Sequence, residues 1–166
     1  MTAAATQSFS IAPNLIERVL AILSGLLGVV VVIAVARGHA EWGYVPPVVW
    51  VHLLAVLVAV ALTPVLLLRP RGDRMHRIMG WVWATAMFLT AAVSFGVRLI
   101  RPGHFSLIHI LSAFTVAMVP LLVLSARRHK VAEHRRRVRL MITGALLIAG
   151  FFTFPFDRLL GHWLFS

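Results

Sequence analysis

The sequence predicts an all-α integral membrane protein with five transmembrane helices. Three observations lead to this fold class. The 166 residues are 60% hydrophobic and only 13% charged, which is too apolar for an ordinary soluble domain. The apolar residues form five runs of about 20 residues, the length that a helix needs to cross a bilayer. Short segments rich in arginine, proline and glycine separate these runs.

The chain is expected to form a single membrane domain over residues 1–166. The five runs predict helices at 18–37, 47–68, 78–100, 105–126 and 138–160. A helix satisfies its own backbone hydrogen bonds, as any segment in lipid must. Residues 1–17 are expected as a cytoplasmic tail and 18–37 as a peripheral helix. The segment 47–160 then forms a four-helix core.

The junctions between the runs favour helix termination. They lie at 37–39, 46–47, 69–73, 101–103 and 127–139. The second helix opens with a Pro-Pro pair, and proline suits the first helical position because it lacks an N–H. Asp73 is a candidate N-cap for the third helix, since its side chain can accept a hydrogen bond from the first turn.

Positive charge predicts the orientation, because arginine and lysine gather on the cytoplasmic side of a membrane. With the N-terminus inside, twelve basic residues lie on the cytoplasmic side and four on the other. The twelve are Arg18, Arg69, Arg71, Arg74, Arg77, Arg127, Arg128, Lys130, Arg135, Arg136, Arg137 and Arg139. The four are Arg37, Arg98, Arg101 and Arg158. We therefore expect a cytoplasmic N-terminus and a C-terminus on the opposite side.

A weak internal repeat relates the second and third helices to the fourth and fifth. His76 follows His52 by 24 residues, and His134 follows His109 by 25. In each half a proline lies between the two histidines, and an arginine follows the second one. Parallel repeats related by an axis along the membrane normal are a known way to build a membrane bundle. Helices two to five are therefore expected to form a bundle of two pseudo-repeated hairpins.

The repeat places the four histidines in two layers near opposite sides of the membrane. His52 and His109 lie about one helical turn inside the outer surface, and His76 and His134 lie at the inner surface. The members of each pair would face each other across the bundle. Ionisable residues inside a membrane usually serve a function, and this favours a functional role for the outer pair, His52 and His109. Packing or lipid contact is the alternative role for all four.

Facing histidine pairs in a helix bundle are typical of b-type haem, whose iron takes two axial imidazoles. Small residues follow each outer histidine by one turn and leave room for a flat ring. Arg77 and Arg135 follow the inner histidines and are candidates to bind the haem propionates. The leading interpretation is a membrane b-type haem protein that carries electrons across or within the membrane, with one or two haems b.

A copper or zinc site is the main alternative, because imidazole also suits these metals. In the predicted topology His39 and His104 lie on the same side as His52 and His109. These four histidines are the candidate ligands of a non-redox metal site at the outer face. A third interpretation is a cofactor-free accessory subunit of a larger membrane complex.

Several function classes are excluded by composition. The net charge of +11 does not indicate nucleic acid, since the basic residues lie between apolar runs, where they meet lipid headgroups. The absence of cysteine excludes disulfides and iron–sulfur clusters. No arrangement typical of a hydrolase or transferase is found, so any activity is expected to be that of an electron-transfer cytochrome. The expected partners are the lipid bilayer and a quinone or redox partner protein.

Two stretches carry a resemblance to a known family. They are VHLLAVLVAVALTPVLLLRPRGDRMHRIMGWVWA, from residue 51, and ARRHKVAEHRRRVRLM, from residue 126. In these the sequence resembles the small bacterial membrane proteins known as domain of unknown function 2306. The resemblance covers about residues 48–160 and implies the bacterial inner (cytoplasmic) membrane. The side that the charge count predicts for the C-terminus is then the periplasm. It implies no settled activity.

A looser similarity, to cytochrome b561-type di-haem four-helix proteins, rests on the layered histidines alone. Proteins of that type place the inner pair a turn or two within the membrane. Here His76 and His134 lie at its edge, so the similarity supports an inner haem less well than an outer one.

Overall fold

The computed structural model describes residues 12–100, 107–155 and 158–166. Every regular element in these ranges is a helix. The elements are α1 (Leu15–Arg37), η1 (Gly38–Tyr44), α2 (Pro47–Leu68), α3 (Arg74–Ile100), α4 (Leu107–Arg127), α5 (Val131–Leu140), η2 (Met141–Ile148), α6 (Ala149–Phe151) and α7 (Leu159–Phe165). The predicted all-helical class is confirmed for the described part of the chain.

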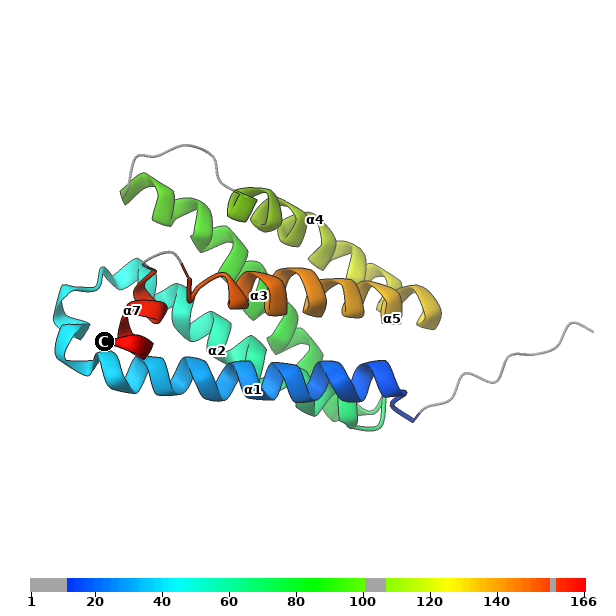
Figure 1. Ribbon diagram of the computed structural model, residues 1–166. Coiled ribbons are helices and arrows are strands. Elements are labelled where there is room, and N and C mark those ends of the chain that lie inside the picture. The colour runs from blue at the N-terminus through cyan, green and yellow to red at the C-terminus, as the bar shows by residue number, and fades with distance from the viewer. Residues whose placement is uncertain (1–11, 101–106, 156–157) are drawn as a thin grey trace, which may run out of the picture.

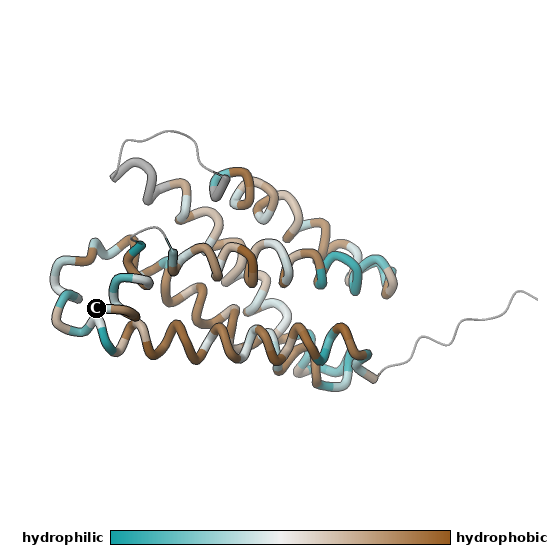
Figure 2. Tube along the Cα trace, in the orientation of Figure 1, coloured by the Kyte–Doolittle hydropathy of each residue, from teal (hydrophilic) through white to brown (hydrophobic). Residues whose placement is uncertain are grey.

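Four helices of the described chain are long and apolar enough to cross a membrane. They are the segments Leu15–Tyr44, Pro47–Leu68, Arg74–Phe95 and His109–Arg127. Figure 2 shows hydrophobic residues along most of α1, and a cluster of hydrophilic residues at the start of α5. The four helices suggest a multi-pass membrane protein in contact with a lipid bilayer.

The fifth predicted span, 138–160, is not among these four helices. The structure joins α5, η2 and α6 into one continuous helical segment that begins at Val131 and ends at Phe151. Its first ten residues include four arginines and a glutamate. The segment ends in turns before Pro155, because proline disfavours a helical conformation of the residue before it. A fifth transmembrane helix therefore stays a prediction.

Local signals explain where the first three long helices begin. α2 occupies the predicted range and has Pro47 at its first position. α3 is capped as expected, since Asp73 Oδ1 accepts a hydrogen bond of 2.6 Å from the His76 N–H. α1 begins three residues earlier than expected. Asn14 and Glu17 form a capping box, in which each side chain accepts a hydrogen bond from the other's backbone, at 3.1 and 3.0 Å.

Helix α1 is integrated into the bundle, although the sequence led us to expect a peripheral helix. It packs against α2, η2 and α7, while α3 packs against both α2 and α4. Leu20 and Ala21 of α1 belong to the same buried core as Ala59 of α2 and as Met141 and Ile142 of η2. α1 and η2 therefore close one side of the bundle together.

The two ends of the bundle differ in composition. At one end α7 folds back beside η1 and the end of α1, and we call this the α7 end (Figure 1). At the other end lie the start of α1, the turn between α2 and α3, and the start of α5 (Figure 1). We call this the basic end, because it carries the arginine-rich segments 69–77 and 127–139.

Candidate functional site

A cavity of about 780 Å³ lies inside the bundle towards the α7 end. Residues from every element except α5 line it, and we call it the α7-end cavity. Its size falls within the range of about 300–1,000 Å³ that is usual for small-molecule and cofactor sites. Part of its wall is η2, whose π-helical turns supply Ala145 and Leu146. Such turns are rare and occur often at functional sites.

His52 lies on the wall of this cavity, in the second turn of α2. Its Nδ1 is 3.1 Å from the backbone carbonyl oxygen of Thr90 on α3. The hydroxyl of Ser94 also donates to this carbonyl, at 2.8 Å. When Nδ1 carries the proton and donates to Thr90, the lone pair of Nε2 is left for a ligand. Histidines that bind metals are usually oriented by such a hydrogen bond to a backbone carbonyl.

The remaining polar groups of the cavity are mostly hydroxyls. Thr115 Oγ1 on α4 donates to the Leu111 carbonyl at 2.7 Å, so its donor is satisfied within its own helix. Thr90 Oγ1 is buried and has no hydrogen-bond partner among the described residues. An unsatisfied buried hydroxyl costs about 1–3 kcal/mol. A molecule bound beside this part of the cavity wall would therefore gain a hydrogen bond with the Thr90 hydroxyl.

The end of the cavity nearest α7 carries charged residues. Glu41 of η1 accepts hydrogen bonds from Trp163 Nε1 at 2.9 Å and from His162 Nε2 at 3.1 Å. Both donors lie on α7, so these contacts hold α7 beside η1. Glu41, His162 and Arg158 also line the cavity. The cavity thus has an apolar interior with the His52 imidazole on its wall, and a second imidazole, that of His162, at its charged end.

The two outer histidines, His52 and His109, contact different residues. His109, near the start of α4, lies against Phe95 of α3, with ring centroids 6.4 Å apart. It is not among the residues that line the α7-end cavity. His52 contacts the carbonyl of Thr90, one turn earlier in α3. His52 and His109 therefore contact different parts of α3, and the expected facing pair stays a prediction.

The two inner histidines are closer to the expected arrangement. His76 on α3 and His134 on α5 lie within electrostatic range of each other at the basic end. His134 Nδ1 is 3.2 Å from the Leu122 carbonyl oxygen on α4. Burial lowers the pKa of His134 below its usual value, and the nearby guanidinium groups of Arg137 and Arg71 lower it further. The Nδ1 of His76 is buried without a hydrogen-bond partner in the described part of the chain.

The two arginines proposed for haem propionates are engaged by the protein itself. Arg77 Nη1 donates to the Gly72 carbonyl at 2.9 Å. Arg135 donates to both carboxylate oxygens of Glu17, from Nε and Nη2, each at 3.1 Å. Arg158 instead has its cationic side chain at the α7-end cavity. The sequence analysis counted it only among the basic residues expected on the outer side of the membrane.

Glu17 is a site that sequence reasoning missed. The residue is nearly fully buried, at 2% exposure, although it is ionisable and lies at the start of an apolar helix. Arg71, Arg135 and Arg139 all form ion pairs with it. The capping-box pattern of Asn14 and Glu17 was the available signal. This signal predicts a helix start, but not the three arginines from the α2–α3 turn and α5.

The candidate metal ligands are not grouped in the described chain. His39 is exposed on η1, with Nδ1 3.2 Å from the Ala36 carbonyl oxygen. His104 lies outside the described residues. Among the residues that the structure describes, no three histidine, aspartate or glutamate side chains lie close enough together to hold a metal ion. A copper or zinc site therefore stays a prediction.

Comparisons with known proteins add no identification. No protein-family model, curated protein or solved structure gives a significant match to the chain. The resemblances to domain of unknown function 2306 and to cytochrome b561-type proteins stay predictions, and any proposal about function has to rest on the geometry of the site.

Proposed function

We propose that the chain is a membrane redox protein that binds haem b in the α7-end cavity, with His52 as an axial ligand. The observation that carries the proposal is the cavity of about 780 Å³ with His52 on its wall, oriented through Nδ1 by the Thr90 carbonyl. A haem in this position would supply one-electron chemistry inside the membrane, and its potential would depend on the surrounding dipoles and charges.

The residues present fit this group in three respects. The apolar wall, which includes Leu53, Met87 and Leu146, suits a porphyrin ring. Arg158 at the charged end suits a propionate, because a cationic donor binds a carboxylate strongly. The Thr90 carbonyl holds the His52 ring in one orientation, so that Nε2 is the nitrogen available to iron.

His109 remains our candidate for the second axial ligand. It lies three residues before Ser112 on α4, and residues at this spacing share one face of a helix. Ser112 lines the cavity, so His109 lies one turn further along the face that α4 presents to it. A second haem between His76 and His134 belongs to the same proposal, because these two histidines lie close together at the basic end.

Location and orientation are also part of the proposal. We propose five transmembrane helices in a bacterial inner membrane, with the N-terminus in the cytoplasm and the C-terminus in the periplasm. The support is the clustering of arginine at the basic end, which the positive-inside rule assigns to the cytoplasm. The α7-end cavity then lies near the periplasmic surface.

An absorption spectrum of the detergent-purified protein tests the haem directly. Protein from haem-replete cells should show a sharp reduced α-band after dithionite, and a pyridine haemochrome assay should count one or two haems per chain. His52→Ala should lose the haem of the α7-end cavity. His39→Ala is the matched control, because His39 is exposed and does not line the cavity, and it should keep the full haem content. A colourless wild-type protein, or a full haem content in His52→Ala, overturns the proposal.

A quinone site in the same cavity is a second candidate. The observation that favours it is the buried Thr90 hydroxyl without a partner in the described chain, which can donate to a quinone carbonyl. Organic extraction of the purified protein and chromatography would identify a bound quinone. Quinone bound to a colourless wild-type protein, and lost in Thr90→Val, supports this candidate over the haem. Metal analysis of the same preparation tests the copper or zinc alternative, and a preparation without any of these ligands leaves the accessory-subunit interpretation.

A further inference from the structure

A second cavity lies between α3 and α4, away from His52 and from the α7-end cavity. It has a volume of about 400 Å³ and is lined by nine residues. From α3 these are Trp81, Ala84, Thr85 and Phe88, and from α4 they are Val119, Pro120, Val123, Leu124 and Arg127. We call it the α3–α4 groove. It opens to the surface of the bundle, since Trp81 is 57% exposed and Phe88 is 42% exposed.

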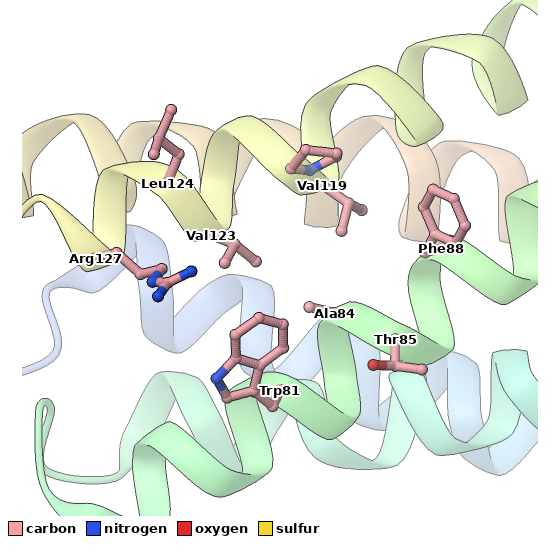
Figure 3. Close-up of a pocket in the computed structure, with 9 residues that line it drawn as sticks. Trp81, Ala84, Thr85, Phe88, Val119, Val123, Leu124 and Arg127 are labelled. Carbon is pink, nitrogen blue, oxygen red and sulfur yellow. The ribbon is translucent and has the colours of Figure 1, made fainter.

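The groove has an apolar body and one cationic end. On α3 the lining residues recur at helical spacing, so they form one continuous face. Figure 3 shows Phe88 towards one end of the groove, and Arg127 and Trp81 towards the other. Arg127 is the last residue of α4, so the charge lies at the basic end of the bundle.

The surroundings add to this positive charge. Arg127 is exposed and forms no ion pair within the described chain. Arg77, which is also exposed, lies one turn before Trp81 on α3, and residues four apart share one helix face. The guanidinium of Arg127 lines this end of the groove, while that of Arg77 donates to the Gly72 carbonyl and adds positive charge from nearby without lining it. Tryptophan is itself enriched where a bilayer meets water, which is the depth of a lipid headgroup.

We propose that the α3–α4 groove is a binding site for an anionic phospholipid. The phosphate would contact Arg127 beside Trp81, and one acyl chain would lie along Ala84, Phe88 and Val123. Charge complementarity favours this occupant, because a basic pocket at the end of an apolar groove matches a lipid with a negative headgroup. A transmembrane helix is about 10–12 Å wide with its side chains and does not fit a groove of about 400 Å³.

Binding in the groove can be distinguished from a general attraction of anionic lipid to a basic surface. Arg128 follows Arg127 in the sequence and is also exposed, but it does not line the groove. Arg127→Gln and Arg128→Gln therefore remove the same charge from neighbouring positions, and only the first removes it from the groove. Thr85 is an exposed lining residue, so Thr85→Phe fills the groove without a change in charge.

The test measures which lipids stay bound to the full chain. The protein is reconstituted into vesicles of phosphatidylglycerol and phosphatidylcholine in equal amounts and extracted gently. Native mass spectrometry then counts the retained lipids, and circular dichroism with gel filtration confirms that each variant is folded. The wild type should retain more phosphatidylglycerol than phosphatidylcholine. Arg127→Gln should lower this retention about fivefold, the usual effect of one arginine at an anionic surface. Arg128→Gln should leave it unchanged, and Thr85→Phe should lower the retention of both lipids.

Three results overturn the proposal. One is equal retention of the two lipids by the wild type, which shows that no headgroup charge is recognised. Another is an equal loss in Arg127→Gln and Arg128→Gln, which shows attraction to the surface without a site. The third is a dimer of the wild type that Thr85→Phe converts to a monomer, because the groove would then be a contact between two copies of this chain.

Discussion

Arg135 and Glu17 form a two-fold hydrogen-bonded ion pair between residues 118 positions apart in the sequence. Nε and Nη2 of the arginine each lie 3.1 Å from one carboxylate oxygen of Glu17. Two parallel bonds of this kind restrict geometry as well as contributing energy. Arg71 and Arg139 pair with the same carboxylate, so Glu17 joins α1 to the α2–α3 turn and to α5.

Glu17→Gln should destabilise the protein strongly, because it removes the counter-charge of three arginines in a buried site. Loss of one partner of a buried ion pair usually costs about 3–5 kcal/mol. Glu133→Gln is the matched control, since Glu133 is 39% exposed at its side chain and pairs with Arg137 on α5 and with Lys130. It should cost less than about 1 kcal/mol. Thermal unfolding in detergent, followed by circular dichroism, measures both; equal shifts in Tm would contradict the role of Glu17.

Gly38→Ala should displace α7. A Cβ atom at residue 38 would lie 2.1 Å from the ring of Trp163, which is 1% exposed and cannot move without disturbing its neighbours. Overpacking of this kind costs about 1–3 kcal/mol. Gly43→Ala is the control on the same 3₁₀ helix, because its added Cβ would have no described atom within 4 Å apart from those of its chain neighbours. Limited proteolysis of residues 158–166 should be faster in Gly38→Ala only; unchanged cleavage would argue against this packing.

Stability should fall as the pH drops below about 6.5, the usual pKa of histidine. Burial and nearby guanidinium groups lower the pKa of His134 in the folded protein. Between that lowered pKa and 6.5 the unfolded chain binds the proton more readily, so protonation favours unfolding. His134 therefore contributes its full share of the stability above pH 6.5. This share is lost as the pH falls, and the loss is complete below the pKa of His134 in the folded protein. His134→Gln should therefore flatten the dependence of Tm on pH below about pH 6.5.

His129→Asn is the control for this pH dependence. His129 is exposed, and its φ of 54° lies in the left-handed region that asparagine tolerates well. The variant should keep the full dependence of Tm on pH. If His134→Gln retained the same slope as the wild type, His134 would not be the group responsible, and His76, which lies within electrostatic range, would be the next to replace.

Single cysteines should report the orientation in the membrane, because the natural chain has none. Ala40 on η1 and Ala132 on α5 are both exposed and lie at opposite ends of the bundle. In the proposed topology Ala40→Cys faces the periplasm and reacts with a membrane-impermeant maleimide in intact spheroplasts. Ala132→Cys faces the cytoplasm and reacts only after the membrane is permeabilised. The reverse labelling pattern would invert the topology.

The helices that the sequence predicted well depend on local chemistry. The bounds of α2 follow from Pro47 at its start and from an unbroken apolar run. The start of α3 follows from Asp73, whose carboxylate caps the first turn. These signals act over a few residues, so they can be read from the chain without knowledge of its neighbours. The fifth segment was harder to predict, because its apolar run continues past the point where the turn at 152–155 ends the helix.

The candidate site depends on contacts that link distant parts of the chain. The spacing of the histidines predicted two facing pairs, which stay predictions. It could not show that His52 contacts the Thr90 carbonyl or that His109 lies against Phe95. It also buries Glu17 among arginines more than 50 positions away. Hydropathy and helical spacing specify which residues are helical and apolar. The rotation of each helix about its axis, which decides the side chains that share a cavity, follows from the packing of all helices together.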